Sequence, residues 1–199
     1  MNLGYVISTI IASLILLSLV ALNSRIIRGS GEQTLYTMAK IQSDMIVGYI
    51  QDDMRSMGYQ IDNAAITLAD SNRIRFLVHF EGNAEASAID WWFDTDAAAT
   101  GRNPNVRPLY RRISAHDADP NFDPATDTNT EEIGTGVVAF RLQYLNSQRE
   151  VIADPETQLG NIRQIRMNVI TESLESYDAN RFNRSTWSGE ITPFNLASN

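Results

Sequence analysis

An uninterrupted apolar stretch near the N-terminus constrains this chain more than any other feature. No charged residue precedes Arg25, and residues 5–22 read YVISTIIASLILLSLVAL. About 20 apolar residues at 1.5 Å each cross a hydrocarbon layer of about 30 Å, and a buried helix in a small domain is seldom apolar on every face. The stretch therefore predicts a membrane-spanning helix.

A cleaved secretory signal peptide is the alternative interpretation of the same stretch. Such a peptide carries basic residues before its apolar run and a small-x-small cleavage site after it. The chain begins MNLG and leaves the run through SRIIRGSGEQ, which offers neither a preceding Lys or Arg nor an obvious A-x-A site. We therefore expect the helix to be retained.

Composition excludes several classes of function. The 199 residues suit one domain with a core, and 16 Lys and Arg against 24 Asp and Glu give a net charge of −8. This acidic balance does not suit direct binding of nucleic acid, which requires a surface that neutralises phosphates. The absence of Cys from the sequence excludes disulfides, zinc–thiolate sites, iron–sulfur clusters and thiol catalysis.

Amphipathic spacing follows the apolar stretch without a proline, so we predict one helix from about residue 3 to residue 57. Gly29 and Gly31 are expected to weaken or bend it, and Gly58 to end it. A helix of that length measures about 80 Å, so half of it lies outside a bilayer. Its large apolar side chains recur every three to four residues, at Leu35, Met38, Ile41, Met45, Tyr49, Met54 and Met57.

Beyond residue 59 the apolar period changes to two, which is typical of strands with one buried face. We predict strands at 73–80, 88–93, 108–113, 137–145 and 162–171, with a turn at 70–72. They are expected to form an antiparallel sheet covered by the amphipathic half of the helix. The side chains expected to point inward are Ile74, Phe76, Val78, Phe80, Ile89, Trp91, Phe93, Val138, Phe140, Leu142, Tyr144, Ile165, Met167 and Val169.

The titratable residues do not form a recognisable catalytic motif. His79 and His116 have no accompanying Ser or Cys motif, and we interpret both as ordinary surface or edge histidines. Asp90 falls on the polar face of a predicted strand, whereas Asp94 and Asp96 fall in a turn, so they do not form an acid–base pair. We therefore expect no enzymatic activity, no catalytic residue and no cofactor-binding residue.

An oxygen-rich segment, DADPNFD at 117–123, resembles the start of a calcium-binding loop. Phe122 stands where an EF-hand turn requires Gly, and Thr128 stands where that loop has a bidentate Glu. A solvated acidic loop is the favoured interpretation, and an irregular Ca²⁺ site is the alternative. The candidate ligands of that site are Asp117, Asp119, Asn121 and Asp123.

Several strings occur in an order shared with one family. They are IQDDMRSMGY at the end of the helix, the strands IRFLVHF, IDWWFD and LYRRI, the segment GVVAFRLQYLNSQREVI, the strand IRQIRMNVIT and the closing RSTWSGEITPFNL. With the short polar N-terminus and the apolar half-helix, they resemble type IV pilins, most of all W-type minor pilins and J-type minor pseudopilins of type II secretion. The resemblance implies an α+β, pilin-like fold, in which a long N-terminal helix packs on an antiparallel β-sheet head.

The resemblance divides the chain into four parts. Residues 1–4 are a short leader or mature N-terminus, 5–24 the transmembrane and assembly half-helix, 25–58 the amphipathic half-helix and 59–199 the β-rich head. The implied function is that of a structural subunit of a type IV pilus-like filament or pseudopilus, as a minor subunit of its tip or priming complex. The alternatives are a major pilin that builds a whole surface filament and a membrane-anchored binding domain that never polymerises.

The resemblance also implies partners and a location. The partners are other pilin or pseudopilin subunits, an inner-membrane assembly platform, prepilin peptidase and membrane lipid. The implied location is a single pass through the inner membrane with an exported head, and a periplasmic or cell-surface filament after assembly. Applied alone to Arg25 and Arg28, the positive-inside rule places the head in the cytoplasm instead.

The processing site departs from the family pattern. The family carries GFTLxE, whereas residues 4–9 read GYVIST. Gly4 followed by Tyr5 is compatible with cleavage after Gly4, but Thr9 stands where the family has Glu. If Met1 is instead the mature first residue, Tyr5 occupies that position. The missing acid fits a subunit at a filament tip, and it equally fits a lineage that polymerises by apolar packing alone.

The apolar half-helix supplies the surface expected to pack against sister helices. Small residues at Ser8, Ala12, Ser13, Ser18 and Ala21 would let such helices approach closely. The apolar residues expected to make the contacts are Val6, Ile7, Ile10, Ile11, Leu14, Leu17 and Val20.

Overall fold

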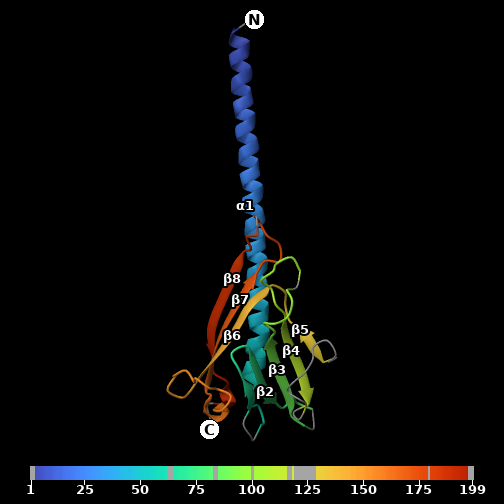
Figure 1. The fold of residues 1–199 in the computed structure, drawn as a ribbon, viewed down its shortest axis with the longest axis vertical. Helices are drawn as coiled ribbons and strands as arrows, with labels where there is room; N and C mark the ends of the chain where they lie inside the picture. The colour runs from blue at the N-terminus through green and yellow to red at the C-terminus, as the bar shows by residue number, and fades with distance from the viewer. Residues whose placement is uncertain are drawn as a thin grey trace.

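The protein consists of one long helix that projects from a β-rich head (Figure 1). The computed structural model describes residues 3–61, 65–82, 85–99, 101–115, 118, 129–178 and 180–196. The described N-terminal end lies at the far tip of the helix, whereas the C-terminal end lies in the head at the opposite end of the molecule (Figure 1). The α+β class predicted from the sequence is therefore confirmed.

The helix α1 spans Leu3–Ser56 without interruption. It passes through Gly29 and Gly31, so the weak point expected there does not break it. The predicted stop at Gly58 is confirmed, because this residue adopts a left-handed φ of 73° and its N–H donates to the Leu77 carbonyl at 2.9 Å.

Within the described residues, eight strands form two antiparallel sheets, whereas the sequence predicted a single sheet. Alternation along a strand identifies its buried face but does not say which strand it pairs with. The five-stranded sheet, in the order β1-β2-β3-β4-β5, consists of β1 (Ile66–Ala69), β2 (Arg73–Val78), β3 (Ser87–Phe93), β4 (Leu109–Ala115) and β5 (Thr130–Glu132). The three-stranded sheet, in the order β6-β7-β8, consists of β6 (Val137–Leu145), β7 (Gln164–Glu172) and β8 (Arg184–Ile191).

The strands that the sequence did not predict are β1, β5 and β8. The first two are only 4 and 3 residues long, and β8 reads RSTWSGEI, which lacks an apolar alternation. Two short 3₁₀ helices, Leu159–Asn161 and Phe194–Leu196, complete the described elements.

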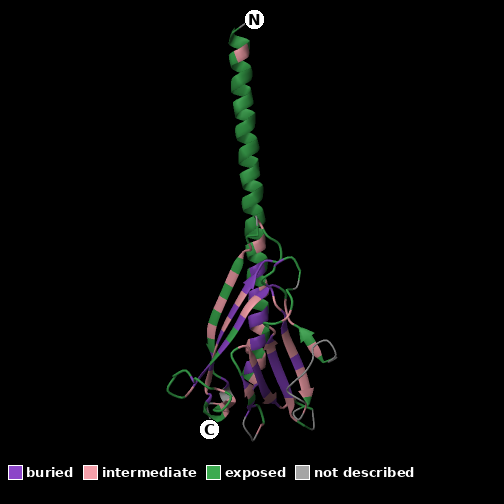
Figure 2. Cartoon of the chain, in the orientation of Figure 1, coloured by how far each residue is buried: buried purple, intermediate pink, exposed green. Residues whose placement is uncertain are grey.

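The core lies where the lower half of α1 meets the inner faces of both sheets (Figure 2). Most side chains expected to point inward are buried, and Phe80 is half-buried. The expectation for Val138 is wrong. The β6–β7 register shifts between Val137 and Ala139, so Val137 is buried instead and Val138 is only half-buried.

The helix face that packs on the sheets differs from the predicted one. Met54 and Met57 are buried as expected, but the rest of the buried stripe consists of smaller or different residues. The helix and the sheets approach so closely that only side chains that fit the available space can face the sheets. The Thr171 hydroxyl donates to the Ala39 carbonyl at 2.9 Å, and a Cβ on Gly134 would lie 2.5 Å from the Ile46 Cδ1. The buried residues of α1 are Ala39, Ser43, Ile46, Val47, Ile50 and Met54.

A buried carboxylate joins the two sheets. Glu172 at the end of β7 is 3% exposed, and its Oε1 accepts hydrogen bonds from Arg184 Nε at 3.0 Å and Nη2 at 2.6 Å. Its Oε2 accepts from Asn103 Nδ2 and Asn105 Nδ2, each at 3.0 Å. Both asparagines belong to the connection between β3 and β4, so Glu172 ties the five-stranded sheet to the end of the three-stranded sheet.

The Glu172 network predicts a pH-dependent stability. Burial raises the pKa of Glu172, but the hydrogen bonds from Asn105, Arg184 and Asn103 outweigh it and hold this pKa below its ordinary value of 4.5. A lowered pKa in the folded state stabilises the fold above about pH 4.5, and this stabilisation is lost as the pH falls through the folded-state pKa. We expect Glu172→Gln to lower the free energy of unfolding by about 1 to 3 kcal/mol at neutral pH, with a difference that shrinks toward about pH 3.

Denaturant unfolding of the full chain in detergent micelles measures both values. Glu175→Gln is the matched control, because Glu175 is 56% exposed and pairs with Arg102 only at the surface. A Glu172→Gln difference that is the same at both pH values would contradict the assignment.

Candidate functional site: the exposed surface of the long helix

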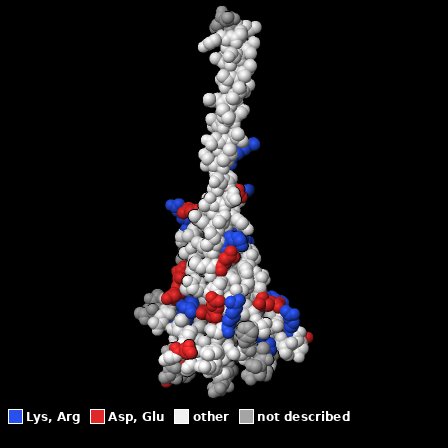
Figure 3. Space-filling model, turned by 180° about the vertical axis from the view of Figure 1, so that it is seen from behind, with Lys and Arg blue, Asp and Glu red and all other residues white. Residues whose placement is uncertain are grey.

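The apolar half of α1 lies entirely outside the head. Ile10, Leu14 and Leu17 are 55%, 58% and 64% exposed, and the other predicted assembly residues are also exposed except Val6, which is partly buried. An 18-residue window of the helix has a mean hydropathy of 2.5, and none of it is buried. Figure 3 shows no charged side chain on the described upper rod. This helix is long and apolar enough to cross a membrane.

Three hydroxyl groups of this half, those of Thr9, Ser13 and Ser18, donate back to carbonyls of the same helix. Thr9 Oγ1 donates to the carbonyls of Tyr5 and Val6, each at 2.9 Å. Ser13 Oγ donates to the Thr9 carbonyl and Ser18 Oγ to the Leu14 carbonyl, both at 2.8 Å. These bonds satisfy the hydroxyls without water, which an apolar environment requires. Thr9 therefore presents a neutral group that is hydrogen-bonded within the helix.

Small residues open a shallow groove along one face of the rod. Gly4, Ser8 and Ala12 follow one another at intervals of four residues, and a Cβ on Gly4 would meet no atom within 4 Å. Ile7, Ile11 and Ile15 complete the lining. A neighbouring helix can approach closely at such a face. The predicted processing residues Gly4 and Tyr5 lie at the distal tip, where Tyr5 is 74% exposed.

A second apolar stripe continues down the half of α1 that belongs to the head. Their spacing predicted that these side chains pack against the sheet, and this prediction is wrong. They lie on the helix face opposite the buried stripe, since Ala39, Ser43 and Ile50 face the sheets. The exposed residues of the stripe are Met38 at 55%, Ile41 at 61%, Met45 at 48% and Tyr49 at 54%.

A carboxylate clamp fixes the orientation of the helix on the five-stranded sheet. Asp53 accepts hydrogen bonds from Arg111 Nε at 2.7 Å and Nη2 at 2.8 Å, and from Trp91 Nε1 at 2.9 Å. The hydrogen bond with Asp53 raises the pKa of Arg111, although burial acts in the opposite direction. By holding the buried stripe against the sheets, the clamp keeps the apolar stripe turned outward.

The titratable residues singled out in the sequence have structural surroundings. Asp94 Oδ1 accepts from the N–H groups of Asp96 and Ala97, which confirms the predicted turn. His79 is half-buried just after β2, and His116 lies outside the described residues.

Asp90 lies on the polar outer face of β3 as predicted, but it is buried there by arginines. Its side chain is 0% exposed and forms ion pairs with Arg112 at 3.0 Å, Arg73 at 3.3 Å and Arg75 at 3.8 Å. Alternation placed this residue on the outer face correctly, but it could not show that arginines of both neighbouring strands converge on it.

The metal prediction stays open. In the part of the chain that the structure describes, no group of three or more His, Cys, Asp or Glu is placed to hold a metal ion. The calcium candidates Asp117, Asp119, Asn121 and Asp123 lie outside the described residues.

No protein-family model matches the chain, and no curated protein matches it. The structure by itself shows a long apolar N-terminal helix packed on an antiparallel β-rich head, which is consistent with a pilin-like architecture. A more specific assignment therefore has to come from what the exposed helix surface can do.

The clamp predicts a difference between two adjacent aspartates. Asp53→Asn leaves the 20%-exposed Arg111 side chain without its anionic partner, so we expect the free energy of unfolding to fall by about 1 to 3 kcal/mol. Asp52→Asn is the control, because Asp52 is 78% exposed and its pair with Arg55 is a surface pair worth at most about 0.5 kcal/mol. Denaturant unfolding in detergent measures both variants, and equal losses would refute the clamp.

Proposed function

We propose that this protein is a structural, non-enzymatic subunit of a type IV pilus-like filament or pseudopilus, and that it acts as a minor subunit in the tip or priming complex. The observation that carries the proposal is the apolar surface of α1, which extends much further than a bilayer reaches.

Distances along the helix distinguish a filament subunit from a simple anchor. Residues 5–22 suffice to cross a hydrocarbon layer of about 30 Å. Met38 then lies about 24 Å along the axis beyond residue 22, and Tyr49 about 40 Å beyond it. Lipid that surrounds residues 5–22 does not reach this stripe. A permanently anchored monomer would leave it in water, whereas the helix of a neighbouring subunit would cover it.

The two parts of the surface contribute differently to assembly. Around residues 5–22, assembly replaces lipid by protein, so the hydrophobic effect supplies little net free energy and close packing must supply the rest. The stripe on the head half faces water before assembly. Each of its four side chains is about half exposed, so covering each contributes on the order of 1 kcal/mol. The stripe therefore favours association at the level where the subunit leaves the bilayer.

The neutral N-terminal tip supports a minor subunit. In the family, the glutamate that Thr9 replaces pairs with the N-terminal amine of a neighbouring subunit within the membrane, where an unpaired charge is costly. Thr9 bonds to its own backbone instead. A subunit at the tip has no further neighbour to receive, so the loss fits that place in the filament.

The proposed pathway involves several partners. The chain is held in the inner membrane by residues 5–22 with an exported head. Prepilin peptidase processes it, and an inner-membrane platform joins it to other pilin or pseudopilin subunits. It ends in a periplasmic or cell-surface filament.

If the helix of a neighbouring subunit covers the stripe, a charge placed on the stripe should impair assembly without impairing folding. Met45→Asp places a charge on an exposed helical position, so we expect unchanged stability of the head but a marked loss of the chain from sheared filaments or from the purified tip complex. Gln33→Asp, which adds the same charge at an exposed position about 120° around the helix from Met45, should assemble normally, as should Met45→Leu. Normal assembly of Met45→Asp would argue against the proposal.

The mature N-terminus tests the processing step. Mass spectrometry of the chain from cells that express its native assembly machinery is expected to find cleavage after Gly4 and an N-methylated Tyr5. An intact Met1 would instead favour a membrane-anchored binding domain. Abundance in sheared filaments then distinguishes a minor from a major subunit.

A further inference from the structure

The exposed apolar stripe on the lower half of α1 ends in a negative charge. Its four apolar residues are followed on the same face of the helix by Asp52, whose side chain is 78% exposed. Asp52 pairs with Arg55 at 3.3 Å, but a pair of exposed side chains contributes little, so this carboxylate can take another partner. The five positions of this face are Met38, Ile41, Met45, Tyr49 and Asp52.

The apolar half of α1 repeats this pattern and ends it in a positive charge. Arg25 is the first charged residue of the chain, it is exposed, and no described residue forms an ion pair with it. The exposed residues that precede it on the same face follow at the same intervals of three and four as those of the stripe. The five positions of this second face are Ile11, Leu14, Ser18, Leu22 and Arg25.

One axial displacement brings the two faces into register. Arg25 and Asp52 are 27 positions apart in the sequence, which corresponds to about 40 Å along a helix. When two parallel helices are displaced by this amount, Arg25 of one lies level with Asp52 of the other, and the small Ser18 lies level with the large Met45. The remaining three levels match apolar side chains with apolar side chains. Intervals of three and four are those by which parallel helices interlock along a continuous seam.

Arg28 fits the same role less well. It is 24 positions from Asp52, so a pair between these two residues requires a smaller displacement. That displacement places the Arg25 guanidinium level with Tyr49, within the apolar stripe, where burial of a charge without a partner is costly. The displacement by 27 residues instead keeps charge out of the apolar levels.

We propose that the stripe binds the apolar half-helix of a second copy of this chain, parallel to the first and displaced by 27 residues, with an ion pair between Arg25 of the second copy and Asp52 of the first. A guanidinium–carboxylate pair adds geometric specificity to an apolar seam, which by itself tolerates sliding. This contact rests on the proposed function, because it names the neighbour that covers the stripe. The tip complex then contains at least two copies of this chain.

The displacement also links the contact to extraction from the membrane. In this register, residue 5 of the second copy lies level with residue 32 of the first, about 15 Å beyond residue 22. Residues 5–22 of the second copy have therefore left the hydrocarbon layer that holds residues 5–22 of the first. Two copies that lie side by side in a bilayer do not make this contact. The stripe thus receives a helix that has already been extracted.

Cross-linking between single cysteines tests the register, and the sequence contains no other Cys. Two differently tagged copies, one with Ser18→Cys and one with Met45→Cys, are expressed together in cells that contain the native assembly machinery. A short bismaleimide is expected to join them in sheared filaments or in the purified tip complex. Lys40→Cys in place of Met45→Cys is the matched control and should not cross-link, because Lys40 is exposed but lies about 140° around the helix from Met45. Cells without the machinery should give no cross-link, because both copies then stay in the bilayer.

Exchange of the two charges gives a second readout. Arg25→Glu and Asp52→Arg each place like charges opposite one another, so each alone is expected to lower the amount of assembled chain at least about tenfold. The two substitutions combined restore the pair with its charges exchanged and should recover assembly. Arg28→Glu combined with Asp52→Arg should not recover it.

The outcomes separate this register from the proposed function. Assembled chain that gives no cross-link between Ser18→Cys and Met45→Cys would overturn the register and leave the proposed function standing, as would rescue of Asp52→Arg by Arg28→Glu. A cross-link in cells without the machinery would overturn the displacement. A cross-link of Met45→Cys to a different subunit alone would overturn the second copy as the partner. Absence of the unsubstituted chain from every filament and tip complex would contradict both proposals.

Discussion

The contact between the lower half of α1 and the two sheets is the interaction on which the rest of the molecule depends. The two inner sheet faces share this helix as their cover, and small residues such as Ala39 and Ser43 let it approach closely. Bonds from Asp53 of the helix to Arg111 of one sheet, and from Thr171 of the other sheet to the Ala39 carbonyl, fix that approach. They determine the rotation of the helix about its axis. The rotation decides which side chains face the core and which face solvent.

Much of the fold follows from hydrophobic period, but the rotation of the helix does not. The apolar run, the helix end at Gly58 and the longer strands were predictable because each has a strong local signal. The orientation of α1 was predicted wrongly because Met38, Ile41, Met45 and Tyr49 recur at the same helical spacing as the residues that are buried, and spacing alone does not say which face meets the sheets. A helix with apolar residues on two faces has no single stripe for the sequence to reveal.

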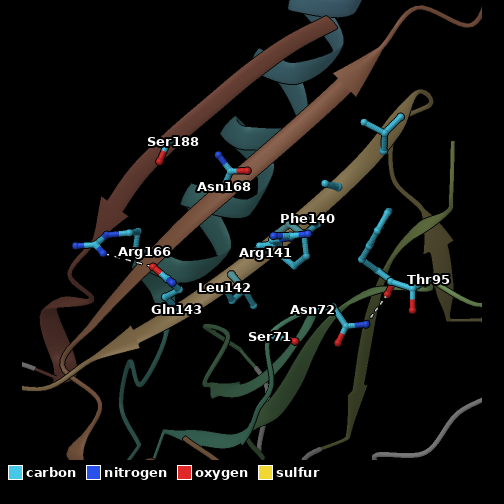
Figure 4. A pocket seen from close by; sticks show the side chains of 13 residues that line it. Ser71, Asn72, Thr95, Phe140, Arg141, Leu142, Gln143, Arg166, Asn168 and Ser188 are labelled. Carbon is cyan, nitrogen blue, oxygen red and sulfur yellow. Dashed lines mark hydrogen bonds between the residues drawn. The ribbon is translucent and has the colours of Figure 1, made fainter. Parts of the chain in front are cut away.

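The candidate sites, too, could be predicted only where the sequence signal is local. Exposure of residues 5–22 could be inferred from composition, since no small head can cover that length of helix. The Asp53 clamp could not, because it needs an acid on the helix to meet Trp91 and Arg111 from two strands distant in sequence. The hollow between the two sheets, which Ser71, Phe93 and Leu142 help to line (Figure 4), could not be predicted, because the sequence indicated only one sheet.

Because the lower half of α1 packs along both sheets, a force along its axis would act on this contact in a particular way. Pulling on the rod would load the Asp53 bonds, the Thr171 bond and the buried stripe together, parallel to the interface, rather than peeling them apart one after another. An interface loaded in shear resists until many contacts fail at once. The head is thus built to stay attached when its helix is pulled along the axis.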